Sequence, residues 1–283
     1  MTAMLSREAF GRAKEFLATR ARKLEEALYR YEFEKGPAEA VGRELENYRN
    51  GDGGFGRGLE PDLRCPESSA LAATTALQTM LRLDVRDDAA IERTLRYFRD
   101  TYDERINGWD IIPKAAENSP RAIWWEYGAF REHWGNPNAE IAGYFNLHPR
   151  EASAELSETL NVYAEKYLKE RCGRQEMHEM LCFVRWARTL PAERLKPLRA
   201  ELDEFVGNCV VREPANGNGY GCYPLTLIES PESPYYSEYR ETIPAELDRL
   251  IAEQDRTGHG PRTGLGEETK KSGKSPVPNG KAC

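Results

Sequence analysis

Carboxylates beside glycine-rich loops are the residues of this chain whose type and spacing suit chemistry best. Asp52 lies within the run NGDGGFG at residues 50–56, Glu60 and Asp62 follow shortly after it, and Asp110 follows a Gly-Trp pair. Two carboxyl groups held roughly 5–10 Å apart can act as acid and base in glycoside chemistry. We therefore take Asp52, Glu60, Asp62 and Asp110 as candidate catalytic residues. The structural alternative for Asp52 is that its carboxylate accepts backbone N–H bonds inside its own loop.

Aromatic side chains gather around the same loops. Residues 97–145 contain 11 aromatic residues in 49 positions, whereas the whole chain is 10% aromatic. Ring faces that line a dry cavity stabilise a passing cation by about 0.5–2 kcal/mol each. The alternative is an aromatic helical core, and adjacent tryptophans on a helix point about 100° apart, so one of such a pair would face a cavity. The candidate substrate-binding residues are Phe55, Trp109, Trp124, Trp125 and Tyr220.

Helices must position these residues, because apolar positions recur at i, i+3, i+4 and i+7 along most of the chain. Strand patterns are nearly absent, so the pattern predicts an all-α fold. We expect one domain over residues 1–256. The Gly- and Pro-rich residues 257–283 carry few aliphatic side chains and are predicted to form a disordered or divergent tail. The expected helices cover 7–33, 37–48, 68–83, 88–102, 138–146, 151–170, 175–190, 193–210 and 243–255.

Composition narrows the classes of function. The net charge of −7 argues against a nucleic-acid partner, and the chain has no apolar run of about 18 residues that would span a membrane. The N-terminal segment lacks the apolar core of a signal peptide, so we expect a cytoplasmic protein, with loose membrane association left open. The six cysteines form no C-x-x-C pair, which favours reduced thiols. No nucleotide motif or nucleophile elbow is present, and we assign no cofactor and no metal.

A glycine followed by an aromatic residue recurs along the chain, at Gly54-Phe55, Gly108-Trp109 and Gly219-Tyr220, with a weaker echo at Gly258-His259. The first two intervals are 54 and 111 residues, which indicates a unit of about 55 residues with a missing member near residue 164. Such a unit holds two helices and two loops, and helical hairpins of this kind stack side by side and can close into a ring. Chance pairing is the alternative.

The NGDGGFG loop and its echoes resemble the repeat of terpenoid cyclases and protein prenyltransferase β subunits, a superfamily that includes squalene and hopene cyclases. The resemblance implies an α/α toroid, here incomplete at its C-terminal end, and an isoprenoid substrate in a central aromatic cavity. The chain departs from the family at Asp84-Val-Arg-Asp87-Asp88, which stands nearest to the cyclase Asp-x-Asp-Asp acid and which helix capping also explains. It departs again at Tyr220, where the prenyltransferases have a zinc-binding aspartate.

Three functions therefore remain open. A protein acting on isoprenoids predicts an apolar cavity with Trp or Tyr faces. A carbohydrate-active α/α barrel using the same carboxylates predicts an open polar groove with paired acids. A non-catalytic helical toroid that binds a partner predicts neither, with Asp52 bonded to the amides of its loop.

Overall fold

The computed structural model describes residues 4–83, 87–213 and 221–259, and helices are their regular elements. The β pairing recorded for these residues consists of isolated bridges. The predicted all-α class is confirmed. No helix among the described residues combines the length and apolar character needed to cross a membrane.

Most helices follow the predicted segments, apart from a division near the N-terminus that is described below. The segment 193–210, predicted as one helix, contains two helices and a 3-10 turn, and the short helices Pro224–Leu227 and Tyr236–Tyr239 were not predicted. Ser69 caps α4 by accepting the Ala72 N–H at 3.0 Å, and Asp87 caps α5 by accepting the Ala90 N–H at 3.0 Å. Asp87 is thus a capping residue, while Asp84 lies outside the described residues. The α-helices are α1 (Arg7–Arg20), α2 (Lys23–Glu34), α3 (Ala38–Glu46), α4 (Ala70–Arg82), α5 (Asp88–Asp100), α6 (Gly135–Leu147), α7 (Ala154–Glu170), α8 (Met177–Ala187), α9 (Ala192–Leu195), α10 (Arg199–Cys209), α11 (Pro224–Leu227), α12 (Tyr236–Tyr239) and α13 (Ile243–Ala252), with 3-10 turns η1 (Lys114–Asn118) and η2 (Lys196–Leu198).

The chain divides into two compact units. Pro37–Asn208 forms one unit, which contains α3 to α9 and all but the last residue of α10. The other joins Met1–Gly36 to Cys209–Cys283 and contains α1, α2 and α11 to α13. Residues 260–283 of the predicted tail lie outside the described residues.

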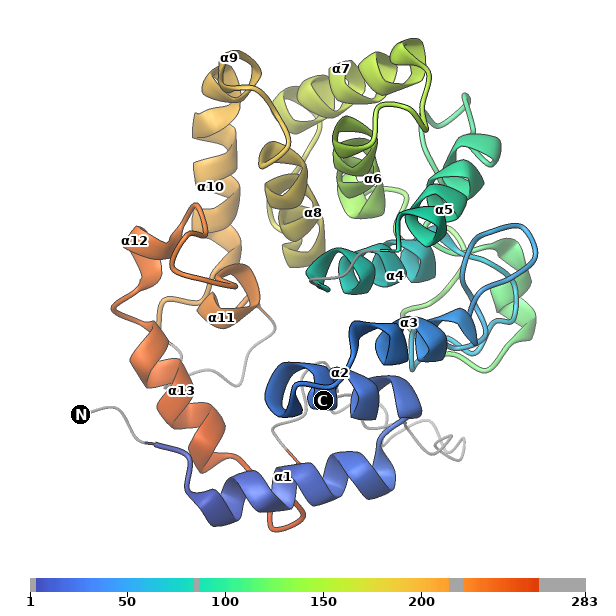
Figure 1. Ribbon diagram of the computed structural model, residues 1–283. Coiled ribbons are helices and arrows are strands. Elements are labelled where there is room, and N and C mark those ends of the chain that lie inside the picture. The colour runs from blue at the N-terminus through green and yellow to red at the C-terminus, as the bar shows by residue number, and fades with distance from the viewer. Residues whose placement is uncertain (1–3, 84–86, 214–220, 260–283) are drawn as a thin grey trace. The chain divides into compact units, whose positions relative to one another are not determined.

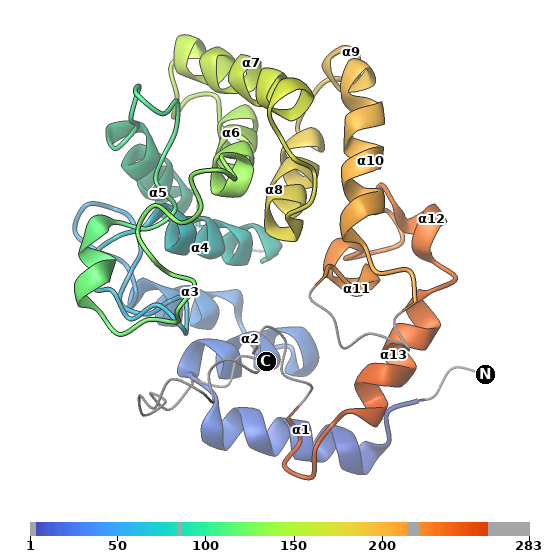
Figure 2. The ribbon, with the colours of Figure 1, turned by 180° about the vertical axis from the view of Figure 1, so that it is seen from behind.

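Close packing of α6 on α8 forms the core of the Pro37–Asn208 unit, and the two helices lie side by side in both views (Figure 1 and Figure 2). Glycines permit this contact. A Cβ at Gly135 would lie 2.3 Å from Phe183, and one at Gly143 would lie 3.1 Å from the Trp186 Cα. The Phe183 ring stacks on Tyr167 of α7 at 6.3 Å. Tyr167 therefore packs against the closely packed core that α6 and α8 form.

The segment 7–33, predicted as one helix, is two. The backbone is extended at Ala21 and α2 starts at Lys23. A straight helix would place Phe10 and Phe33 about 35 Å apart, but their rings lie 5.7 Å apart. Ring contacts between the two helices thus accompany the break in the continuous helix that the periodicity predicted.

Two loops, one in each unit, share a pattern of backbone hydrogen bonds. The Asn50 N–H donates to the Gly54 carbonyl at 2.9 Å, and the Gly53 N–H donates back to Asn50 at 3.1 Å. In the same way Asp255 donates to His259 at 2.8 Å, and Gly258 donates back to Asp255 at 3.1 Å. Gly53 and Gly258 both adopt positive φ, of 90° and 87°. The Gly258-His259 loop thus repeats the turn of the first loop, but one residue out of the predicted register, because Gly258 corresponds to Gly53 and His259 to Gly54.

Each of these loops docks against one helix through its positive-φ glycine. A Cβ at Gly53 would lie 2.7 Å from the Arg93 carbonyl of α5, and one at Gly258 would lie 2.3 Å from the Arg12 carbonyl of α1. The residue before each loop binds the same helix. Arg49 Nη2 donates to the Ala90 carbonyl at 3.1 Å, and Gln254 Nε2 donates to the Ala9 carbonyl at 3.2 Å. The loop is therefore a joint between helices in both units.

The other predicted members of the repeat differ. Asp103 and Gly108 close a related turn that is one residue longer, with Asp103 donating to Gly108 at 3.0 Å and Gly108 donating back at 3.2 Å. The member expected near residue 164 is wrong, because that position lies inside α7. Gly219-Tyr220 lies outside the described residues.

Candidate functional site

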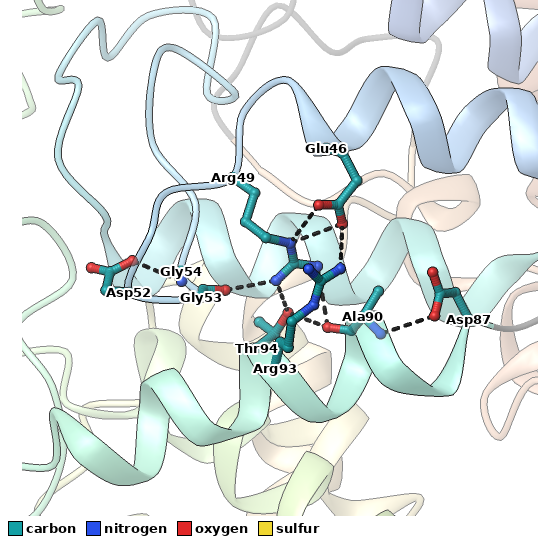
Figure 3. A network of polar contacts seen from close by, with 9 residues as sticks. All are labelled: Glu46, Arg49, Asp52, Gly53, Gly54, Asp87, Ala90, Arg93 and Thr94. Atoms are coloured by element: carbon teal, nitrogen blue, oxygen red, sulfur yellow. Dashed lines mark hydrogen bonds and ion pairs between the residues drawn. The ribbon is translucent and has the colours of Figure 1, made fainter.

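Asp52 and Arg49 fasten the loop that follows α3 (Figure 3). Asp52 Oδ1 accepts the Gly54 N–H at 2.9 Å and the Ser68 hydroxyl at 2.8 Å. The Arg49 guanidinium donates to the Gly53 carbonyl at 2.7 Å and covers the ring of Phe55, which is fully buried. The structure thus places Asp52 on a loop amide, as the structural alternative expects, and Phe55 in the core.

Removing the Asp52 carboxylate should loosen this loop. We expect Asp52→Ala to lower the free energy of unfolding by about 1–2 kcal/mol, because the Gly54 N–H and the Ser68 hydroxyl lose their acceptor. Asp52→Asn keeps an oxygen at the Oδ1 position and should cost clearly less. Urea denaturation of the two variants beside the parent protein measures both effects, and equal losses in the two variants would contradict this role.

Glu60 and Asp62 accept hydrogen bonds from side chains that are distant in the sequence but close in the fold. Glu60 Oε1 accepts the Thr75 hydroxyl of α4 at 2.6 Å. Asp62 accepts both neighbouring indole N–H groups, from Trp124 at 3.0 Å and from Trp125 at 2.8 Å. The two tryptophans thus converge on one carboxylate, and all three side chains are half-buried. This arrangement fixes the 121–126 segment against the loop that carries Asp62.

Trp109 and Asp110 line a cavity of about 480 Å³ in the Pro37–Asn208 unit. We call it the Trp109 cavity. Trp109 is held on both sides: its indole N–H donates to the Phe98 carbonyl at 3.0 Å and its backbone N–H donates to Asn138 Oδ1 at 2.8 Å. Gly108 allows this approach, since a Cβ there would lie 2.5 Å from Asn138 Oδ1. The aromatic wall consists of Trp109, Phe130, Trp134, Tyr163 and Tyr167.

Arginines supply much of the charge of the Trp109 cavity. Arg105 pairs with Asp103 at 2.6 Å, and Arg131 lies 3.2 Å from Asp110. Arg171 donates to the Tyr163 hydroxyl at 3.0 Å and, within the described part of the chain, pairs with no carboxylate. Its charge is therefore available to a bound anion, in a protein whose net charge is −7.

Asp110 is already engaged at the cavity wall. Besides Arg131, it accepts the Tyr127 hydroxyl at 2.7 Å. This hydrogen bond raises the pKa of Tyr127, and the Asp110 carboxylate raises the pKa of Arg131. Asp110 thus acts as an anchor for two side chains.

The predicted site residues fall into three places. Asp52 and Phe55 belong to the loop joint, and Trp109 and Asp110 line the cavity. Elsewhere Asp62 meets Trp124 and Trp125, and Glu60 meets Thr75. Tyr220 lies outside the described residues. Sequence reasoning missed the cavity residues Arg105, Arg131, His133, Tyr163, Tyr167 and Arg171. A search for basic residues next to aromatic ones, as in Arg131-Glu-His-Trp134, could have found some of them.

No protein-family model, curated protein or solved structure matches this chain.

Proposed function

We propose that the Pro37–Asn208 unit binds an amphiphilic anion, an isoprenoid diphosphate, in the Trp109 cavity. The observation that carries the proposal is the pairing of an aromatic wall with Arg171, whose charge no described carboxylate balances. A guanidinium binds phosphate oxygens with paired N–H donors. The aromatic and isoleucine side chains of the wall suit an apolar chain.

The cavity volume agrees with a ligand of this size. At about 480 Å³ the hollow lies within the range of roughly 300–1,000 Å³ that is usual for small-molecule pockets. Its wall includes Ile111 and Ile112 in addition to the aromatic rings, and Ile112 is fully buried. Because Ile111 and Ile112 are buried, a chain that leaves the head group at Arg171 would meet the partly exposed rings of Phe130 and Tyr163.

The carbohydrate alternative receives less support. Glycoside cleavage requires two carboxyl groups facing one substrate. Asp52, Glu60 and Asp62 are bonded to loop and helix partners away from the cavity, and Asp110 is held by Tyr127 and Arg131. The shared joint in the two units supports the finer fold of the same proposal, an α/α toroid built from helical hairpins.

The test is titration of the protein with farnesyl diphosphate in a calorimeter. We expect saturable binding, with farnesol and inorganic diphosphate each binding at least tenfold more weakly because each offers half of the contacts. Arg171→Ala should weaken farnesyl diphosphate binding by about 10- to 100-fold, the equivalent of one charge-assisted contact of about 1.5–3 kcal/mol. Arg150→Ala, an exposed arginine outside the cavity wall, is the matched control. Absence of binding to the parent protein, or equal effects of the two variants, would overturn the proposal.

A further inference from the structure

His133 lies in the wall of the Trp109 cavity beside a buried carboxylate. Its Nδ1 is 3.5 Å from Glu179 Oε2, and the Glu179 side chain is 1% exposed, whereas that of His133 is 37% exposed. The carboxylate therefore faces the imidazole from inside the protein, while the imidazole reaches solvent and the cavity. A carboxylate behind an imidazole fixes the orientation of the ring.

Glu179 accepts hydrogen bonds from a backbone N–H and a thiol. The Gly135 N–H donates to Oε1 at 2.8 Å, and the Cys172 thiol donates to Oε2 at 3.5 Å. Burial, with a contribution from Glu179, raises the pKa of Cys172 to about 12, so this thiol keeps its proton. Gly135 is required here, because a Cβ would lie 2.3 Å from Phe183 and 2.9 Å from Glu179.

The backbone on both sides of His133 is held by one side chain. The Tyr167 hydroxyl donates to the Glu132 carbonyl at 2.7 Å and accepts the Trp134 N–H at 3.2 Å. The Arg171 guanidinium lies over the same Tyr167 ring, 5.8 Å from its centre. Tyr167 thus contacts Arg171 through its ring and holds the backbone on either side of His133, and both Arg171 and His133 line the Trp109 cavity.

We propose that His133 donates a proton to the bound diphosphate, that Glu179 is its positioning residue, and that the cavity hydrolyses allylic isoprenoid diphosphates. This inference rests on the proposed function. In the reaction the C1–O bond breaks and its electron pair goes to the diphosphate oxygen, which takes the proton of the imidazolium. Water adds to the allylic C1 and returns a proton to the imidazole. The products are the isoprenoid alcohol and inorganic diphosphate.

The geometry favours a proton donor over a purely structural histidine. A histidine that serves packing alone is buried with both nitrogens satisfied. His133 is instead partly exposed in a cavity wall, and its neighbouring residues are fixed by Tyr167 and Glu179 rather than by the imidazole itself. The imidazole therefore stands on a fixed backbone, beside a buried carboxyl group and with part of its surface exposed.

The test follows release of diphosphate from farnesyl diphosphate in a coupled pyrophosphatase assay, with farnesol identified by chromatography. His133→Ala should lower kcat at least 100-fold with little change in binding of farnesyl diphosphate, and added imidazole should restore part of the rate. Glu179→Gln keeps an oxygen for the Gly135 N–H and should lower kcat about tenfold with KM unchanged. His178→Gln is the matched control, because His178 pairs with Glu176 and does not line the cavity.

The outcomes separate the two proposals. If the parent protein binds farnesyl diphosphate and releases no diphosphate, or if His133→Ala reacts at the parent rate, the inference about His133 is wrong and the binding proposal stands. If the parent protein binds no isoprenoid diphosphate, the proposed function fails first. An equal loss of rate in Glu179→Gln and in the control His178→Gln would reduce Glu179 to a structural role.

Discussion

Replacing Arg49 with methionine should lower the free energy of unfolding of the Pro37–Asn208 unit by about 3–5 kcal/mol, the largest loss that we expect from one side chain in this unit. Arg49 is 9% exposed and burial lowers its pKa, yet it stays charged. Its guanidinium binds Glu46 at 2.8 Å, the Gly53 carbonyl at 2.7 Å and Thr94 at 3.0 Å (Figure 3). Methionine fills similar space but removes the donor that these three acceptors share.

Arg93→Met is the matched control for Arg49→Met. Arg93 shares the partner Glu46, at 3.4 Å, but its side chain is 46% exposed. An exposed ion pair contributes about 0–1 kcal/mol, so this variant should remain close to the parent protein. Urea denaturation monitored by tryptophan fluorescence measures both variants. A loss below about 1.5 kcal/mol for Arg49→Met, or similar losses for the two arginines, would show that α5 is held by apolar packing and not by this guanidinium.

The sequence predicted the helices well because amphipathic periodicity is a local property. The caps of α4 and α5 are likewise local, since Ser69 and Asp87 bind amides three residues ahead. The break at Ala21 was missed because no proline or glycine marks it. It depends on Phe10 meeting Tyr29 and Phe33, which is a contact between helices.

The candidate site was harder to predict, because its residues come together only through tertiary contacts. Asp62 meets two tryptophans more than 60 positions away, and Glu179 reaches Gly135 from 44 positions away. The spacing of carboxylates along the chain indicated a site at the glycine-rich loops. The cavity is built instead from the turn at Gly108, the residues before α6 and one face of α7. That juxtaposition leaves no periodic trace in the sequence.

The loop joint is a predicted feature that occurs in both units. At the first loop the sequence motif marks the joint plainly, with four glycines in the seven residues 50–56. In the Asp255–His259 loop the motif is degraded, but the backbone pattern persists. There Asp255 Oδ1 accepts three donors, the Thr257 N–H at 2.7 Å, the Thr257 hydroxyl at 2.6 Å and the His259 N–H at 3.1 Å. The side-chain carboxylate thus stabilises the turn where extra glycines are lacking.

Gly258→Ala should therefore destabilise the unit formed by the two ends of the chain by about 3 kcal/mol. Its φ of 87° costs a residue with a Cβ about 1–2 kcal/mol. The new Cβ would also lie 2.3 Å from the Arg12 carbonyl and 2.6 Å from the Ala13 nitrogen, so α1 must move away from the loop. Hydrogen exchange should show faster exchange of the α1 amides, while the α8 amides of the other unit keep their protection.

Gly11→Ala in α1 is the control that separates the effect of the loop contact at Gly258 from the effect of replacing a glycine with alanine. Gly11 is exposed and has no neighbouring atom within 4 Å of an added Cβ. A helical glycine replaced by alanine gains about 0.5–1 kcal/mol, so this variant should slow exchange in α1. The exchange rates of the α1 amides should change in opposite directions in Gly258→Ala and Gly11→Ala only if the loop at Gly258 docks on α1. That contact would match the one between the loop at Gly53 and α5. If Gly258→Ala leaves the α1 amides unchanged, α1 is held by its aromatic contacts with α2, and the second joint contributes nothing to the stability of this unit.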